Sequence, residues 1–501
     1  MNVKIVNWYC KSCKLIFFIF LFGILSFGRA FSIINIKIGS FFSVFITEII
    51  IFLCLPFIIM CFKDIQKLPK IFLVFLVAYL FYGCFYLGSG LLNNNLFALR
   101  DIVLCVYIVF LPLTLLIFSR FKEMKLVIYI LVLGNIIGLF LGRSSLFNVH
   151  NLYKFQGSHL LVNILSQSRF FNLGLFYGMT SSFLISFFPL LKRRSHIVFV
   201  FLALSFNFYM LIFMGVRSLW SAAFLLIVFL LLNLRMRFFR WFMYFIPVFL
   251  IIASILFYFD FQYTNITPHD ILAKARSLSY FLKETISSRK ITASFPAKEK
   301  SNSPITSPIT SRGNVYGSIS DKASLLDNST ALSKKANVPP QDRSDPLYSY
   351  QISLDNINWR LIIWKESIQF GMKSFWFGGG FGVYPKYNIW NYSTPVGIGL
   401  NSGIIPAHNH LITVFYKMGF CGLFLFLCMN LFVFIYGISN LGKCKTEFAR
   451  SFLAAALGAF LYWHTLAFFF DIIDSPSSSI FLWIIMGLIF KIIDLDRKNY
   501  A

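Results

Sequence analysis

The sequence predicts an all-α polytopic membrane protein, and three observations support that fold class. Of the 501 residues, 58% are apolar and 13% are charged, whereas a soluble globular chain is roughly 45–50% apolar and about 25% charged. The apolar residues fall in blocks of about 17–25, the length that crosses a bilayer as a helix. Every second connection between blocks carries Lys or Arg, as the positive-inside rule requires of cytoplasmic loops. A soluble enzyme and a disordered chain are thereby excluded.

About twelve apolar blocks define the predicted transmembrane helices. In chain order they cover residues 15–33, 42–62, 71–89, 102–118, 126–142, 171–191, 197–214, 219–234, 241–258, 411–437, 448–470 and 478–493. The first block follows three lysines, as a signal peptide would. Because further spans follow at once, we expect an uncleaved first helix.

The basic residues set the predicted topology. They precede the first block, follow the second, fourth, sixth, eighth and tenth, and close the chain; examples are Lys14, Lys63, Arg120, Lys192, Arg235, Lys443 and Arg497. Both termini are therefore expected in the cytoplasm. Much of the net charge of +26 then sets orientation, and no nucleic-acid partner is expected.

The predicted domain organisation has three parts. Helices one to nine lie in residues 1–258, a large periplasmic loop spans 259–410 between helices nine and ten, and the last three helices lie in 411–501. This division leaves one extended segment outside the membrane.

Within that loop, composition separates two segments. Residues 284–346 are rich in Ser, Thr, Pro and Lys, and we expect this insertion to be disordered because it has too few apolar residues to form a core. Residues 350–410 are rich in aromatic residues and glycine and are expected to be ordered. From Trp359 to Phe370 the apolar spacing predicts an amphipathic helix at the outer membrane lip.

Three residues on the predicted outward side could take part in chemistry. Arg217 lies at the turn between the seventh and eighth blocks, where its guanidinium could bind a phosphate or touch lipid headgroups. Arg360 opens the lip helix, where cation–π packing on a neighbouring Trp is the plainer reading. His408 could take a proton from a sugar hydroxyl near neutral pH, or be a polar helix start. His408 and His410 are two residues apart and do not share a helix face, so no metal is expected.

Two motifs resemble a known superfamily. His408-Asn409, nine residues and then Gly419-Phe-Cys-Gly resemble the His-Asn/Ser/Gln-x9-Gly-x-x-Gly motif of the bacterial O-antigen ligases. Arg360, ten residues and then Gly371 resemble the Arg-x10-Gly motif of the related O-antigen polymerases.

Two further elements extend this resemblance over about residues 195–440. Gly-Val-Arg217-Ser resembles the Gly-Ser-Arg-Gly element of the superfamily, with Val216 in place of a small residue. The stretch Phe377-Gly-Gly-Gly-Phe-Gly382 is similar to its glycine-rich segment between the Arg and the His. The chain is identified as a member of this superfamily on the order and spacing of the four elements.

The resemblance implies a metal-independent, inverting glycosyltransferase of the bacterial inner membrane. Such an enzyme needs no cofactor and, on the periplasmic face, moves a glycan from undecaprenyl diphosphate to an acceptor sugar hydroxyl. By this resemblance Arg217 and Arg360 would clamp the diphosphate, while His408 would act as the base or hold the diphosphate. Asn409 and Gly380 are expected to contact the substrate.

Several alternatives stay open at this point. A ligase would use lipid A-core as acceptor, a polymerase would use a second lipid-linked glycan, and transfer to a protein side chain would use the same chemistry. A polysaccharide or lipid transporter or flippase is the rival of another class, and a membrane scaffold is a third. A transporter should keep charged or broken-helix sites near the bilayer midplane, whereas the predicted spans are nearly free of charge at their centres.

Overall fold

The computed structural model describes most of the apolar blocks and part of their connections. The described residues are 3–32, 34–38, 42–60, 65, 68–93, 97–152, 170–214, 216–234, 243, 245–256, 360–385, 407–470, 472, 475 and 476–498. The insertion at 284–346 lies outside them. The contacts of the chain divide it into two units, Met1–Ile266 with Ile357–Ala501, and Thr267–Asn356, and every described residue belongs to the first.

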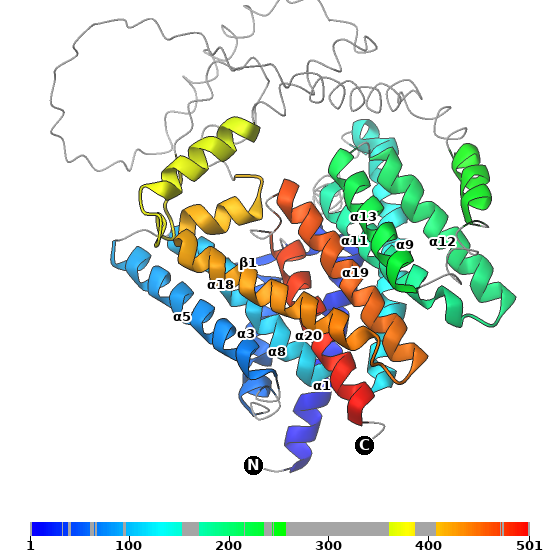
Figure 1. Ribbon diagram of the computed structural model, residues 1–501, viewed down its shortest axis with the longest axis horizontal. Helices are drawn as coiled ribbons and strands as arrows, with labels where there is room; N and C mark the ends of the chain where they lie inside the picture. The colour runs from blue at the N-terminus through cyan, green and yellow to red at the C-terminus, as the bar shows by residue number, and fades with distance from the viewer. Residues whose placement is uncertain are drawn as a thin grey trace, which may run out of the picture. The chain divides into compact units, whose positions relative to one another are not determined.

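The first elements of this unit are mostly helices. In order they are α1 (Val3–Phe27), α2 (Arg29–Ser32), α3 (Ile46–Met60), α5 (Lys70–Leu92), α6 (Phe97–Asp101), α7 (Val103–Val106), the 3-10 helix η1 (Tyr107–Val109), α8 (Phe110–Ile117) and α9 (Phe121–Leu152). Helix α1 packs against α9 and α3. Figure 1 shows this order along the chain.

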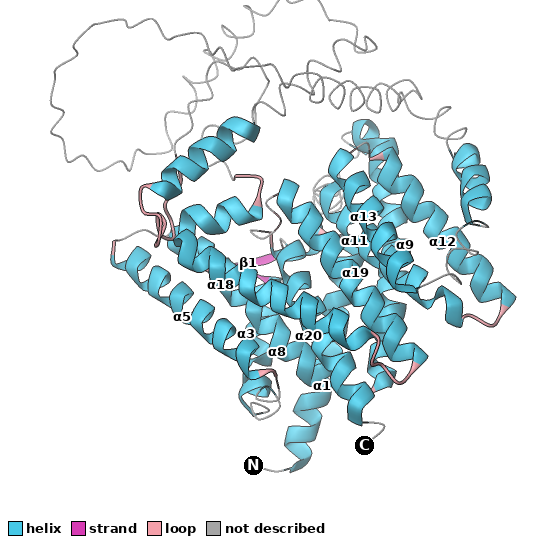
Figure 2. Ribbon diagram, in the orientation of Figure 1, coloured by secondary structure: helices cyan, strands magenta, loops and turns pink. Residues whose placement is uncertain are grey.

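The remaining elements complete the bundle. They are α11 (Phe170–Phe187), the 3-10 helix η2 (Phe188–Leu190), α12 (Arg194–Phe213), α13 (Arg217–Leu234), a helix over Phe245–Leu256, a helix over residues 360–372, α18 (His410–Leu441), α19 (Glu447–Phe469) and α20 (Pro476–Lys498). Figure 2 shows that helix accounts for nearly all of the described chain.

One short β-ribbon departs from the all-α prediction. Strands β1 (Asn35–Ile38) and β2 (Phe42–Phe45) pair antiparallel, with Asn35 opposite Phe45 and Ile38 opposite Phe42. The helix predicted from residue 42 was therefore wrong over its first turn, and α3 begins only at Ile46. β-branched and aromatic residues favour an extended strand when a partner strand lies alongside, which the apolar count could not register.

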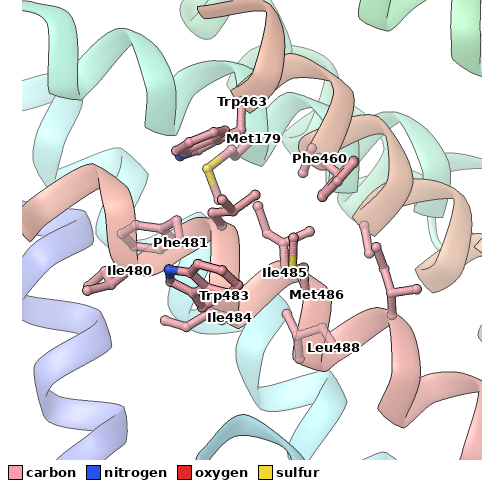
Figure 3. Packing of buried hydrophobic residues seen from close by; sticks show 14 of the residues in the cluster. Met179, Phe460, Trp463, Ile480, Phe481, Trp483, Ile484, Ile485, Met486 and Leu488 are labelled. Carbon is pink, nitrogen blue, oxygen red and sulfur yellow. The ribbon is translucent and has the colours of Figure 1, made fainter. Parts of the chain in front are cut away.

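Helices α19 and α20 form the centre of the bundle. Helix α19 packs against α11, α13, α18 and α20, and α20 also packs against α8. Small residues permit this close approach, as expected for helices in lipid, and Ala454, Ala455 and Ala456 are fully buried. Figure 3 shows Trp463 of α19 beside Met179, with Trp483 of α20 among the buried aliphatic side chains.

Within the part of the chain that the structure describes, six helices are long and apolar enough to cross a membrane. They are Trp8–Phe27, Lys70–Leu92, Arg194–Ile212, His410–Leu441, Glu447–Phe469 and Pro476–Lys498. Shorter apolar helices cover Ile46–Met60, Val103–Ile117, Gly174–Leu190, Ser218–Asn233 and Phe245–Leu256. The prediction of a helical membrane protein is confirmed at this level, and the exact number of spans stays a prediction.

Those predicted basic connections that fall among the described residues meet at one end of the bundle. Lys14 of α1 forms an ion pair with Glu123 at the start of α9, at 2.5 Å. The Phe121 ring packs on Phe448 at the start of α19, with 5.6 Å between centroids, and Phe187 at the end of α11 packs on the same ring at 5.3 Å.

The end of α20 joins this basic end. The Asp496 carboxylate accepts the Lys445 and Thr446 N–H groups at 2.8 and 3.2 Å, just before α19. Lys14 of α1, the beginnings of α9 and α19 and the ends of α11 and α20 therefore lie together. Since α18 and α19 run antiparallel across a short connection, the start of α18 lies at the opposite end.

Candidate functional site

The start of α18 carries the predicted histidine and its neighbour. Asn409 is the N-cap, and its side-chain oxygen accepts the Leu411 and Ile412 N–H groups at 3.0 and 3.2 Å. An Asn cap satisfies amides that a helix start leaves without partners. His408 precedes it with a φ of 50°, a left-handed conformation that non-glycine residues seldom adopt. The cap therefore fixes the direction in which the chain presents His408.

The helix at 360–372 lies against this turn. The Trp364 indole Nε1–H donates to the Ala407 carbonyl at 2.8 Å. Ile363, Ala407 and Tyr416 form a fully buried apolar cluster between the helix, the turn and α18. These contacts bring Arg360, the first residue of the helix, close to His408.

Arg360 lies near enough to His408 for its charge to act on the imidazole. Burial lowers the pKa of Arg360, and its guanidinium lies over the Phe470 ring, 5.2 Å from the centroid. Burial, and secondarily the charge of Arg360, lowers the pKa of His408 to about 4. At neutral pH the site thus holds one fixed cation beside a neutral imidazole, which can accept a proton or a hydrogen bond.

Arg217 begins α13 at the same end of the bundle. A Cβ on Gly174 would meet the side chain of Leu219, and the Tyr462 hydroxyl donates to the Gly174 carbonyl at 2.8 Å. Tyr462 lies about two turns before the end of α19, the end that contacts the Arg360 helix. The three predicted site residues thus belong to one end of the bundle, while the clamp role of Arg217 stays a prediction.

The glycine-rich segment fills a break in α18. Gly419 has φ 65° and ψ −169° inside this helix, so the helical hydrogen bonds are interrupted there. The Gly379 and Gly380 N–H groups donate to the Tyr416 and Lys417 carbonyls at 2.7 and 2.9 Å. The segment therefore substitutes for the missing turn of helix on the N-terminal side of the break.

The same segment also serves the other side of the break. The Phe420 and Cys421 N–H groups donate to the Phe375 and Trp376 carbonyls at 2.7 and 3.2 Å. A Cβ on Gly378 would lie 2.4 Å from the Gly419 nitrogen, so only glycine permits this approach. The segment turns tightly here, with positive φ at Gly378, Gly380 and Gly382. The substrate contact predicted for Gly380 stays a prediction. The Gly380 N–H donates to the Lys417 carbonyl.

A buried ion pair beside the break was missed by the sequence interpretation. Lys417 Nζ lies 2.7 Å from Asp101 Oδ1, and both side chains are essentially inaccessible. Asp101 Oδ1 also accepts the Tyr384 hydroxyl and Oδ2 accepts the Gly382 N–H, each at 2.7 Å. The available signal was Lys417 itself, the one Lys, Arg, Asp or Glu in the sequence of α18, since an ionisable residue inside an apolar helix needs a partner.

This pair bears on one expectation. The spans were expected to be nearly free of charge at their centres, and that counted against a transporter. Lys417 lies seven residues inside α18, about 10 Å from its start, beside a broken helix. The pair therefore lies away from the middle of this helix, and the charge-free centres stay a prediction.

A second polar group lies deeper in the bundle. The His464 Nε2 and Asn430 Oδ1 atoms are 2.9 Å apart, and the ring of His410 lies 5.7 Å from that of His464. His464 is therefore hydrogen-bonded within the bundle interior.

Comparison with known proteins identifies a family that matches part of the chain. Residues 199–427 match the family model described as O-antigen ligase. The matched region begins in α12 and ends in α18, and it includes Arg217, Arg360 and His408. No curated protein matches the chain.

Proposed function

The chain belongs to the O-antigen ligase-related superfamily through residues 199–427, and from this premise we propose that it is an inner-membrane glycan transferase. It moves a glycan from undecaprenyl diphosphate to an acceptor sugar hydroxyl on the periplasmic face. The observation that supports this best is the juxtaposition of the buried Arg360 guanidinium with the neutral His408 imidazole.

The proposed reaction is a single displacement with inversion at the anomeric carbon. The acceptor hydroxyl oxygen attacks that carbon, its proton passes to a His408 ring nitrogen, and the carbon–oxygen bond to the diphosphate breaks. The leaving diphosphate keeps the bonding electron pair. Arg360 and Arg217 stabilise the charge that develops on it, as preorganised cations do in a water-poor site.

The low pKa of His408 fits this order of events. An imidazole with a pKa of about 4 is a weak base, since a general base works best with a pKa near the ambient pH. The incoming diphosphate would offset the charge of Arg360 and raise the His408 pKa toward neutrality. Donor binding would then activate the base, and His408 could also donate to the diphosphate once it is protonated.

The proposed topology follows from the two ends of the bundle. The basic end, where Lys14 meets Glu123, faces the cytoplasm with both termini, and the end that bears His408 faces the periplasm. In this topology of twelve spans, the predicted loop 259–410 connects the ninth and tenth spans on the periplasmic side. Alkaline phosphatase fused within the connection 442–446 should stay inactive, whereas a fusion within the insertion 284–346 should be active.

Substitution of the three site residues tests the transferase. His408→Ala, Arg217→Ala and Arg360→Ala should each lower glycan transfer by at least about 100-fold, with unchanged amounts of protein in the membrane. Matched controls are His196→Ala and Arg194→Ala at the start of α12, which are exposed. A wild-type amount of product from any of the three site variants would refute the role proposed for that residue.

The acceptor class needs a separate experiment. In a strain that lacks the gene, long glycan chains left on the carrier lipid would identify a ligase with lipid A-core as acceptor. A single repeat unit on the capped core would identify a polymerase with a second lipid-linked glycan as acceptor. Unmodified glycoprotein together with normal lipopolysaccharide would identify transfer to a protein side chain.

The transporter or flippase remains a second candidate because of the broken helix and the Asp101–Lys417 pair. Purified protein in vesicles separates the two classes. A transferase should join supplied donor and acceptor when both lie on the same side of the bilayer. A flippase should expose labelled donor on the opposite leaflet and form no new glycosidic bond.

A further inference from the structure

We propose that the Asp101–Lys417 pair is the positioning device of the site, and that the Asp101 carboxylate locks the glycine-rich segment into the break of α18. This inference rests on the proposed function, because it assigns to two residues the task of holding Arg360 and His408 in register. Neither side chain reaches solvent, so neither touches a substrate.

Asp101 forms hydrogen bonds with both segments that meet at the break, the glycine-rich segment with the residues after it and α18. Its Oδ1 atom accepts Lys417 Nζ and the Tyr384 hydroxyl, and its Oδ2 atom accepts the Gly382 N–H, all at 2.7 Å. The ammonium of Lys417 also lies 5.0 Å from the centroid of the Tyr384 ring. One carboxylate thus joins the end of α6, the glycine-rich segment and α18.

The two active residues depend on what this carboxylate holds. The N-terminal stub of α18, residues 410–418, is separated from the rest of the helix by the Gly419 break. His408 precedes the N-cap Asn409 of the stub, and the Arg360 helix packs on the stub through Ile363 and Tyr416. The glycine-rich segment continues that helix and bonds to the carbonyls at the end of the stub.

The Asp101 carboxylate balances the charge of Lys417 and also accepts a hydrogen bond from the Gly382 N–H. A lysine at 101 could pair with an aspartate at 417, but it could not accept the Gly382 N–H, because an ammonium has no acceptor. A buried donor that loses its acceptor is costly even when all charges are balanced. The acceptor function of residue 101 can therefore be separated from the ion pair by mutation.

Two matched double variants separate these functions. Asp101→Asn with Lys417→Met removes both charges and keeps an acceptor for Gly382, whereas Asp101→Leu with Lys417→Met removes the charges and the acceptor. Replacement of a whole buried pair by neutral residues is often tolerated. Asp494→Asn with Lys498→Met removes an ion pair at the basic end and serves as the control.

The first readout is glycan transfer per molecule of membrane protein. The Leu variant should lose about 10- to 100-fold, as expected for one or two buried donors left unpaired. The Asn variant should stay within about tenfold of the control pair. Equal activity of the Asn and Leu variants would overturn the proposal. Full activity of the charge swap Asp101→Lys with Lys417→Asp would overturn it too, since a swap restores only the ion pair.

The second readout does not depend on transfer. Cys421 lies directly after the break, and its N–H is bonded to the Trp376 carbonyl. In a chain whose other cysteines are replaced by alanine, a small thiol reagent should modify Cys421 several-fold faster in the Leu variant than in the Asn variant. Equal rates would refute the lock. The expected rates in a protein without transferase activity would uphold the lock and refute the proposed function.

If the protein with Asp101→Leu and Lys417→Met does not accumulate in the membrane, Tyr384→Phe provides a second test of the proposal. It removes one donor to Asp101 and leaves both charges in place. We expect faster modification of Cys421 and a lower kcat for transfer. Wild-type values of both would overturn the proposal.

Discussion

Gly419→Ala is the sharpest perturbation that the fold offers. At φ 65° and ψ −169° the backbone occupies a region that is essentially restricted to glycine, and a side chain there costs about 1–3 kcal/mol. A Cβ would also lie 2.4 Å from the Trp376 carbonyl oxygen and 2.5 Å from the Gly378 nitrogen. The glycine-rich segment would have to retreat, with loss of the hydrogen bonds from Phe420 and Cys421, each worth about 1 kcal/mol.

Together these terms predict a loss of about 3–5 kcal/mol in stability. The matched control is Gly88→Ala in α5, where an added Cβ would meet nothing within 4 Å. Thermal unfolding of the detergent-solubilised protein should shift down by at least about 5 °C for Gly419→Ala and by almost nothing for Gly88→Ala. An unfolding temperature for Gly419→Ala equal to that of the control would refute the reasoning about the break.

Three further predictions follow from burial and charge. Lys417→Met alone leaves a buried carboxylate unpaired and should lower stability by about 3–5 kcal/mol, measured by thermal unfolding, whereas Lys498→Met on the surface should change it by less than about 1 kcal/mol. Because the pKa of His408 is about 4 in the fold and near 6.5 when unfolded, its contribution to stability is full above pH 6.5 and is lost as the pH falls toward 4. His408→Gln should therefore flatten the decline of the unfolding temperature over that range, and an unchanged slope would contradict the assignment. Gly178→Ala would place a Cβ within 2.4 Å of atoms of the buried Tyr462 ring. This overpacking should lower the free energy of unfolding by about 1–3 kcal/mol, which a lower unfolding temperature would show.

Much of the helical fold could be predicted from the sequence. Each predicted apolar block contains a helix among the described residues, because a backbone in lipid must satisfy its hydrogen bonds internally. The β-ribbon before α3 could not be predicted, since strand pairing between residues 35–38 and 42–45 depends on a partner and not on apolar content.

The site was predictable where its residues act through local motifs. Arg360 and His408 were selected from short spacings, and the structure brings them together. The glycine-rich segment was selected by its resemblance to the superfamily, but its insertion into α18 depends on contacts between distant parts of the chain. Asp101 could not be selected in the same way, because its partner Lys417 lies 316 residues away in sequence and no local pattern links them.

That separation has a consequence for biosynthesis. A ribosome that adds about 5–20 residues per second delivers the 316 residues between Asp101 and Lys417 in roughly 15–60 seconds. During this interval the early helices enter the bilayer while the carboxylate has no ammonium to meet, and an isolated ionised carboxylate is strongly disfavoured there. Asp101 must therefore stay in the wet headgroup layer during this interval, so the final turn of α6 is set in place only after translation has reached α18.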